Sequence, residues 1–192
     1  MAKPVGRRGE TRERVLATAL ELFAEQGVSG TSLQMIADRL GVTKAAVYHQ
    51  FRTKDDIVLE VVRPVMERLL VLLEEAGARP ASQERRRFVV HGLIDLVLAH
   101  RRLLGVLFGD PYVDALLKSH VETSGHTDRL TVLVVGETPS PTDLVSVAVF
   151  GGGLVSVGGD PNLAGLDDGT LRRELRGAAE RLLFTEEVAR VP

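Results

Sequence analysis

The stretch TSLQMIADRLGVTKAAVYHQFRTK, residues 31–54, decides the fold of this 192-residue chain. Its first half carries apolar residues at three- and four-residue spacings up to Gly41, which is the pattern of a short amphipathic helix that ends at a glycine. Thr31 begins a Thr-x-x-Gln capping box, so we expect this helix to start there. Thr43 offers the N-cap of a second short helix. Two short helices around a glycine turn predict a helix-turn-helix.

The second short helix has two different sides. Val47 and Phe51 lie four residues apart and are expected to face inward. Small residues in the first turn let a helix approach the major groove of DNA closely. Thr53 can cap a third helix, and Lys54 in its first turn lies where free N–H groups and the helix dipole favour a phosphate. The residues expected to face outward are small, cationic or hydrogen-bonding: Lys44, Ala45, Ala46, Tyr48 and His49.

This stretch resembles the DNA-binding motif of the tetracycline-repressor (TetR) family of transcriptional regulators. The resemblance is specific over the first third of the chain. It implies an all-α fold, with an N-terminal three-helix helix-turn-helix domain and a larger all-helical ligand-binding and dimerisation domain. The matching residues form one ungapped run: Thr31, Ile36, Ala37, Gly41, Val42, Thr43, Tyr48, His49, Phe51 and Lys54. The resemblance implies phosphate or base contacts by Thr43, Lys44, Ala45, Tyr48, His49 and Lys54, and we add Thr31 to the DNA-binding candidates.

The distribution of charge fits this interpretation. The net charge of the chain is −2, but residues 1–54 carry nine Lys and Arg against five Asp and Glu, which gives +4. Residues 55–192 carry the other fifteen basic and twenty-one acidic residues, which gives −6. A basic N-terminal third on an acidic remainder is typical of a DNA-binding domain attached to a separate regulatory body.

Three segments follow from these patterns. Residues 1–9 are predicted to form a flexible basic arm, in which Arg7 and Arg8 contact the minor groove or phosphates, or simply remain solvated. Residues 10–54 are the predicted DNA-binding domain, whose first helix runs from about Thr11 to Gln26 behind the helix-turn-helix. Residues 55–192 are the predicted ligand-binding and dimerisation domain.

The body is predicted to consist of helices. The helix that starts after Thr53 contains Pro64, which kinks a helix and makes this connector either a hinge or a bend that fits the core. The β-branched run 130–135 fits a helix or a strand, and its helical neighbours favour a helix. Ser82 and Ser140 are the expected N-caps of two further helices.

The family resemblance implies a small-molecule pocket in this body, and such pockets combine apolar walls with a few polar groups. The alternative is that apolar helix residues only fill the core. His91 and Asp95 share a helix face, but two ligands do not make a metal site and no His-Glu-x-x-His pattern is present, so no metal is predicted. The candidate lining residues are Met66, Leu70, Phe88, His91, Leu104, Phe108, Tyr112 and Leu116.

The last two helices are expected to form a homodimer. The three glycines 151–153 cost a helix about 1 kcal/mol each relative to alanine, which close helix–helix approach would offset. An apolar face that the body does not need predicts a four-helix interface with a second copy. Two recognition helices held in this way would read a palindromic operator on double-stranded DNA.

Other classes of protein find little support. There is no cysteine, no Gly-x-Ser-x-Gly elbow, no phosphate-binding glycine loop and no paired-carboxylate motif, so neither an enzyme nor a cofactor is expected. No apolar run of about twenty residues and no secretory signal is present, which predicts a cytoplasmic protein without a membrane partner. The sequence therefore favours a repressor that a small, largely apolar effector releases from DNA. The alternative is an architectural DNA-binding protein without an effector cavity.

Overall fold

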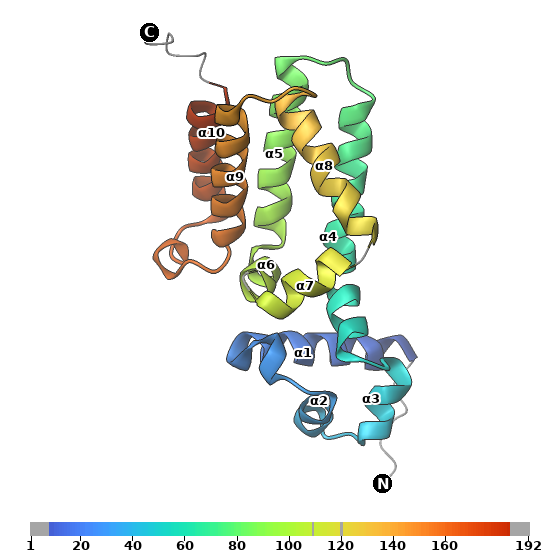
Figure 1. Cartoon of the computed structure of the whole chain (residues 1–192). Coiled ribbons are helices and arrows are strands. Elements are labelled where there is room, and N and C mark those ends of the chain that lie inside the picture. The colour runs from blue at the N-terminus through green and yellow to red at the C-terminus, as the bar shows by residue number, and fades with distance from the viewer. Residues whose placement is uncertain (1–7, 109, 120, 185–192) are drawn as a thin grey trace. The chain divides into compact units, whose positions relative to one another are not determined.

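The computed structural model describes residues 8–108, 110–119 and 121–184, which form α-helices and one short 3-10 helix without any strand (Figure 1). The expected all-α fold is confirmed for this part of the chain, and the run 130–135 is helical. The elements are α1 (Arg8–Gly30), α2 (Leu33–Leu40), α3 (Lys44–Gln50), α4 (Lys54–Gly77), α5 (Gln83–Ala99), α6 (Arg101–Leu107), α7 (Pro111–Ser119), α8 (Val121–Val135), α9 (Pro141–Ser156), η1 (Pro161–Leu163) and α10 (Asp168–Leu183).

The chain forms two compact units whose division differs from the predicted domain boundary. The first unit contains the residues up to Pro64 together with Val106–Ser119, and the second contains Val65–Gly105 together with the residues from His120 onward. The division thus falls directly after the proline inside α4. The predicted body includes residues 111–119, which form α7, whereas α7 packs against α1 and belongs to the first unit.

The first unit has buried apolar side chains on each of its first three helices. Val15 and Phe23 of α1, Ile36 of α2 and Val47 of α3 are nearly inaccessible to water, and α1 packs against α2 and α3. Burial of each such large side chain contributes about 1.5–3 kcal/mol. The turn between α2 and α3 has the predicted form, since Gly41 adopts φ 65°. α2 and α3 therefore have fixed positions against α1.

The N-cap of α2 is not the predicted residue. The Ser32 hydroxyl accepts a hydrogen bond from the Met35 N–H at 3.3 Å, while Thr31 is only 3% exposed and donates to the Gly27 carbonyl at 2.9 Å. Gly27 has φ 76° and interrupts α1 close to its predicted end. The Thr31 hydroxyl is thus bonded to the Gly27 carbonyl, and the next residue, Ser32, caps α2.

The second unit is built around α5, which packs against α8, α9 and α10. Figure 1 shows the part of α4 that belongs to this unit beside α5. An added Cβ on Gly92 would lie 2.4 Å from Leu72 Cδ1, so the α4 and α5 helices approach closely there. The Arg86 guanidinium donates to the carbonyls of Val134 and Leu183, at the ends of α8 and α10. One side chain thus satisfies carbonyls that two helix ends leave open.

Two sets of glycines in the second unit have opposite surroundings. An added Cβ on Gly105 of α6 would lie 2.5 Å from the carbonyl carbon of Gly158, so the two backbones are in direct contact. The glycines 151–153 of α9 have no atom within 4 Å of an added Cβ. The close approach expected for this run is therefore not made within the described chain.

α9 leaves an apolar face uncovered. Val145 and Val149 are 62% and 59% exposed, and Leu144 beside them is also exposed. The helix starts as predicted, because the Ser140 hydroxyl and the Asp143 carboxylate form a capping box. α9 is thus a well-formed helix whose outer side carries aliphatic groups and bare backbone.

Candidate nucleic-acid interface

The exposed side of α3 carries the residues predicted to contact DNA. Tyr48 is 44% exposed, and the Lys44 ammonium lies 5.4 Å from the centroid of its ring. Ala45 and His49 are also exposed, whereas Val47 is buried beneath them. No carboxylate lies on this helix, so its surface presents hydrogen-bonding groups and positive charge to an anionic partner.

Thr43 and Thr31 have structural partners. The Thr43 hydroxyl accepts a hydrogen bond from the Ala46 N–H at 3.3 Å, which confirms Thr43 as the N-cap of α3. Thr31 is buried, so its side chain supports the surface from behind, and we correct its assignment as a contact residue. Arg8 and Gly9, predicted to belong to the flexible arm, instead begin α1. Arg7 lies outside the described residues.

Lys54 is held at the beginning of α4. Its ammonium donates to the carbonyls of Val28 at 2.7 Å and Ser29 at 3.4 Å. It also lies 4.5 Å from the centroid of the Tyr112 ring. Since an ammonium has three hydrogens, a DNA phosphate would share this group with the end of α1.

Arg12 supports α3 in a way that the sequence did not indicate. Its guanidinium donates to the Gln50 carbonyl at 3.2 Å, pairs with Glu60 at 3.2 Å and lies 4.3 Å from the centroid of the Phe51 ring. One side chain of α1 thus contacts the end of α3 and the second turn of α4. Hydrogen bonding to Arg63 and Arg12 lowers the pKa of Glu60, so this carboxylate remains charged at neutral pH.

The residues predicted to line a ligand pocket lie in both units. Met66, Leu70, Phe88, His91 and Leu104 belong to the second unit, and Phe108, Tyr112 and Leu116 belong to the first. Leu104 is part of the buried core of the second unit. The Phe88 ring lies under the Arg79 guanidinium at 3.8 Å, and Phe108 is 45% exposed. Their role in ligand binding stays a prediction.

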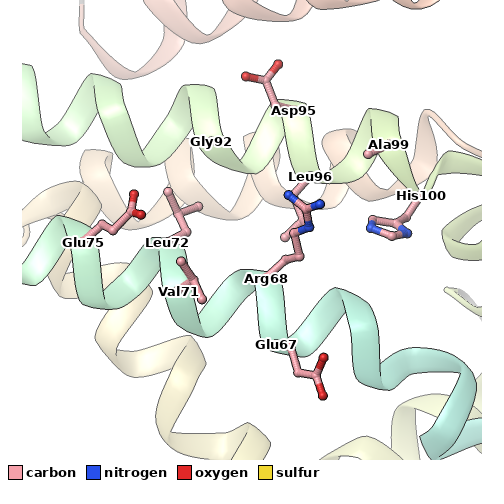
Figure 2. A pocket seen from close by; sticks show the side chains of 10 residues that line it. All are labelled: Glu67, Arg68, Val71, Leu72, Glu75, Gly92, Asp95, Leu96, Ala99 and His100. Carbon is pink, nitrogen blue, oxygen red and sulfur yellow. The ribbon is translucent and has the colours of Figure 1, made fainter.

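Each unit contains a described cavity. The larger, about 760 Å³, lies between α4 and α5 and includes none of the predicted lining residues. Figure 2 shows Arg68 extending from α4 toward α5, while Asp95 points away from α4. The smaller cavity, about 380 Å³, lies around α7 and includes Phe108. The larger cavity is lined by Glu67, Arg68, Val71, Leu72, Glu75, Gly92, Asp95, Leu96, Ala99 and His100.

His91 and Asp95, which share a helix face, interact with other side chains. Asp95 accepts from Arg172 at 2.7 Å and from Arg176 at 3.1 Å. Burial and the nearby Arg176 lower the pKa of His91, whose Nε2 lies 4.0 Å from the Glu180 carboxylate. Within the residues that the structure describes, no three His, Asp or Glu side chains are grouped to hold a metal ion.

Comparison with known proteins identifies the family. Residues 15–61 match the model described as bacterial regulatory proteins, tetR family. The HTH-type transcriptional regulator SrpR of Pseudomonas putida is 30% identical over 166 residues, which cover 74% of this chain and 71% of SrpR. This chain belongs to the TetR family. The HTH-type transcriptional regulator AcrR of Shigella flexneri is 50% identical over 52 residues, which span 27% of this chain but only 24% of AcrR.

Solved TetR-family structures share the fold. SCO3833 from Streptomyces coelicolor A3 superposes with a TM-score of 0.67 at 18% identity, over 96% of this chain and 92% of that one. The ketosteroid transcriptional regulator KstR2 of Mycobacterium tuberculosis gives a TM-score of 0.67 at 20% identity, over 95% and 96% of the two chains. The resemblance found in residues 31–54 is thereby confirmed, and the relatives are regulators rather than enzymes. Across the described residues, no helix has both the length and the apolar character to cross a membrane.

Proposed function

We propose that this TetR-family protein is a cytoplasmic repressor that binds a palindromic operator as a homodimer and leaves it when a small, largely apolar effector binds. The exposed side of α3 carries the proposal. It combines Lys44, Ala45, Tyr48 and His49 on a helix that is capped at Thr43 and has no negative charge. In our proposal Lys44 and Lys54 contact phosphates, Tyr48 and His49 contact phosphates or base edges, and Ala45 permits close approach. We further propose contacts by Arg7, which precedes α1, and by Arg8, the first residue of α1.

The exposed apolar face of α9 supports the dimer. An aliphatic surface of this kind is costly to leave in water, and a second copy of the same helix would cover it. The bare glycines 151–153 would allow the two helices to approach closely, and α10 would complete a four-helix interface. A twofold dimer presents two copies of α3, so its operator is palindromic.

The α4–α5 cavity supports an effector. Its volume of about 760 Å³ lies within the usual 300–1,000 Å³ range of small-molecule sites, and Val71, Leu72 and Leu96 supply apolar walls. An architectural DNA-binding protein has no need of such a space. The effector acts only if it binds the DNA-released conformation more tightly than the DNA-bound one.

The experiment that tests this function is a selection of genomic DNA fragments. Wild-type protein and the double variant Lys44→Ala/Tyr48→Ala are incubated with sheared DNA of the source organism at two salt concentrations. We expect the wild type to enrich a palindromic site, less strongly at the higher salt, because phosphate contacts release counterions. The double variant should enrich none.

Lys118→Ala is the matched control, because it removes one exposed positive charge from α7, where Lys118 pairs with Asp114. It should enrich the same palindrome as the wild type. Failure of the wild type to enrich any sequence, with and without a library of apolar small molecules, would refute the DNA-binding role.

A further inference from the structure

The residue before α7 reaches back to α1 across 82 positions of sequence. The Asp110 carboxylate accepts two hydrogen bonds, one from the Val28 N–H to Oδ2 at 2.9 Å and one from the Tyr112 N–H to Oδ1 at 2.9 Å. Val28 follows Gly27, the residue with φ 76° at which α1 turns. One carboxylate therefore caps the first turn of α7 and anchors the end of α1.

Tyr112 contacts the beginning of α4 in the same region. Its hydroxyl donates to the Asp55 carboxylate, and its ring lies beside the Lys54 ammonium. Lys54 in turn donates to the Val28 carbonyl at 2.7 Å. We call these five residues, Val28, Lys54, Asp55, Asp110 and Tyr112, the α7 clasp. The bond to Asp55 raises the pKa of Tyr112 to about 12, so the hydroxyl keeps its proton at physiological pH.

The clasp holds the two ends of the DNA-binding segment. α2 and α3 lie in the chain between the end of α1 and the start of α4, and Lys54 joins these two ends directly. Whatever fixes these ends fixes the angle at which α3 meets a groove. We propose that Asp110 and Tyr112 are positioning residues for DNA binding, which act through Val28 and Lys54 without touching DNA. This inference rests on the proposed function.

The chemistry of the clasp requires a carboxylate at position 110. Both oxygens accept from backbone N–H groups, and an Asn side chain supplies only one acceptor while its amide donor would face an N–H. Asp110→Asn thus breaks one of two bonds with almost no change in volume. Tyr112→Phe removes the donor to Asp55 but keeps the ring beside Lys54.

The test uses the full chain and two DNA probes. A duplex selected by the wild type from a random-sequence library reports specific binding, and an unselected random duplex of equal length reports non-specific binding. We expect Asp110→Asn and Tyr112→Phe each to lower affinity for the selected duplex about tenfold. Affinity for the random duplex and the salt dependence should stay unchanged, because no phosphate contact is lost. Asp114→Asn, an exposed carboxylate change on the same helix, should bind like the wild type.

Hydrogen exchange of the free proteins separates the possible failures. Asp110→Asn should speed exchange of the Val28 amide while the amides of α5 keep their protection. Normal affinity for the selected duplex, or an equal loss on both duplexes, would overturn the positioning role. If the wild type selects no sequence, the proposed function fails; the clasp is then judged by exchange alone, and an unchanged Val28 amide overturns it.

Discussion

α3 and α9 each have one buried residue, Val47 and Leu154, yet their exposed sides differ in chemistry. α3 presents an ammonium, a phenol and an imidazole, whereas α9 presents Leu144, Val145 and Val149. Groups of the first kind gain from phosphates and base edges, and aliphatic groups gain only from leaving water. The chemistry of the exposed atoms therefore distinguishes the partners that we propose for the two helices.

The largest expected effect is the loss of dimer affinity when a charge is introduced into α9. In Val149→Glu the proposed interface buries two unpaired carboxylates, one from each copy, so dimer affinity should fall more than about 100-fold. Analytical ultracentrifugation measures the dissociation constant of the dimer. Val71→Glu is the control, because Val71 is also exposed but lies on α4. A Val149→Glu protein that remains dimeric would place the interface elsewhere.

A glutamate introduced into α3 should instead weaken DNA binding and leave the dimer intact. Ala45→Glu adds a carboxylate to the surface that faces phosphates, and we expect operator affinity to fall about 100-fold through repulsion and lost close approach. Sedimentation should still show a dimer, since α9 is unchanged. If Ala45→Glu bound the selected duplex normally in an electrophoretic shift experiment, α3 would not be the helix that enters the groove.

A smaller change tests why α9 has a glycine run. Gly152→Ala meets no atom within 4 Å, so it should raise the free energy of unfolding of the monomer by about 1 kcal/mol through helix propensity. In the dimer the added methyl would separate the two backbones and weaken association. Urea unfolding and sedimentation measure the two effects. Gly125→Ala in α8, which also meets no atom within 4 Å, should lack the second effect.

The smallest expected effect is a dependence of stability on pH, which arises from His91 in the second unit. Burial and Arg176 lower the pKa of His91 in the folded protein. Below about pH 6.5, His91 therefore binds a proton more readily in the unfolded chain than in the folded chain. This contribution to stability is therefore lost as pH falls through 6.5 toward the folded pKa. Thermal unfolding at pH 7.5 and 5.5 should show a smaller loss for His91→Gln than for the wild type. An equal loss would mean that His91 titrates normally.

Local chemistry explains what the sequence predicted. Gly41, Thr43 and Ser140 act through neighbours within four residues, so their roles could be inferred without a fold. Thr31 and Ser32 offer the same capping group, and the choice depended on the turn at Gly27.

Contacts between distant parts of the chain could not be predicted in this way. Nothing in the sequence pairs Asp110 with Val28 or Arg12 with Gln50, since these contacts exist only after the helices pack. Periodicity also cannot tell a core residue such as Leu104 from a cavity wall such as Leu96, because both lie on apolar helix faces. The predicted ligand residues are therefore divided between the two units, whereas Lys44, Ala45, Tyr48 and His49, predicted to contact DNA, all lie on α3.

The backbone contact between Gly105 and Gly158 has a consequence for how variants of this protein are interpreted. Any side chain at either position would overlap main-chain atoms, which cannot rotate away. In a saturation-mutagenesis screen for expression of a reporter gene, both positions should tolerate only glycine. They would then score as strongly as true DNA contacts, although their defect is one of protein abundance, and only a parallel measurement of protein level would tell the two classes apart.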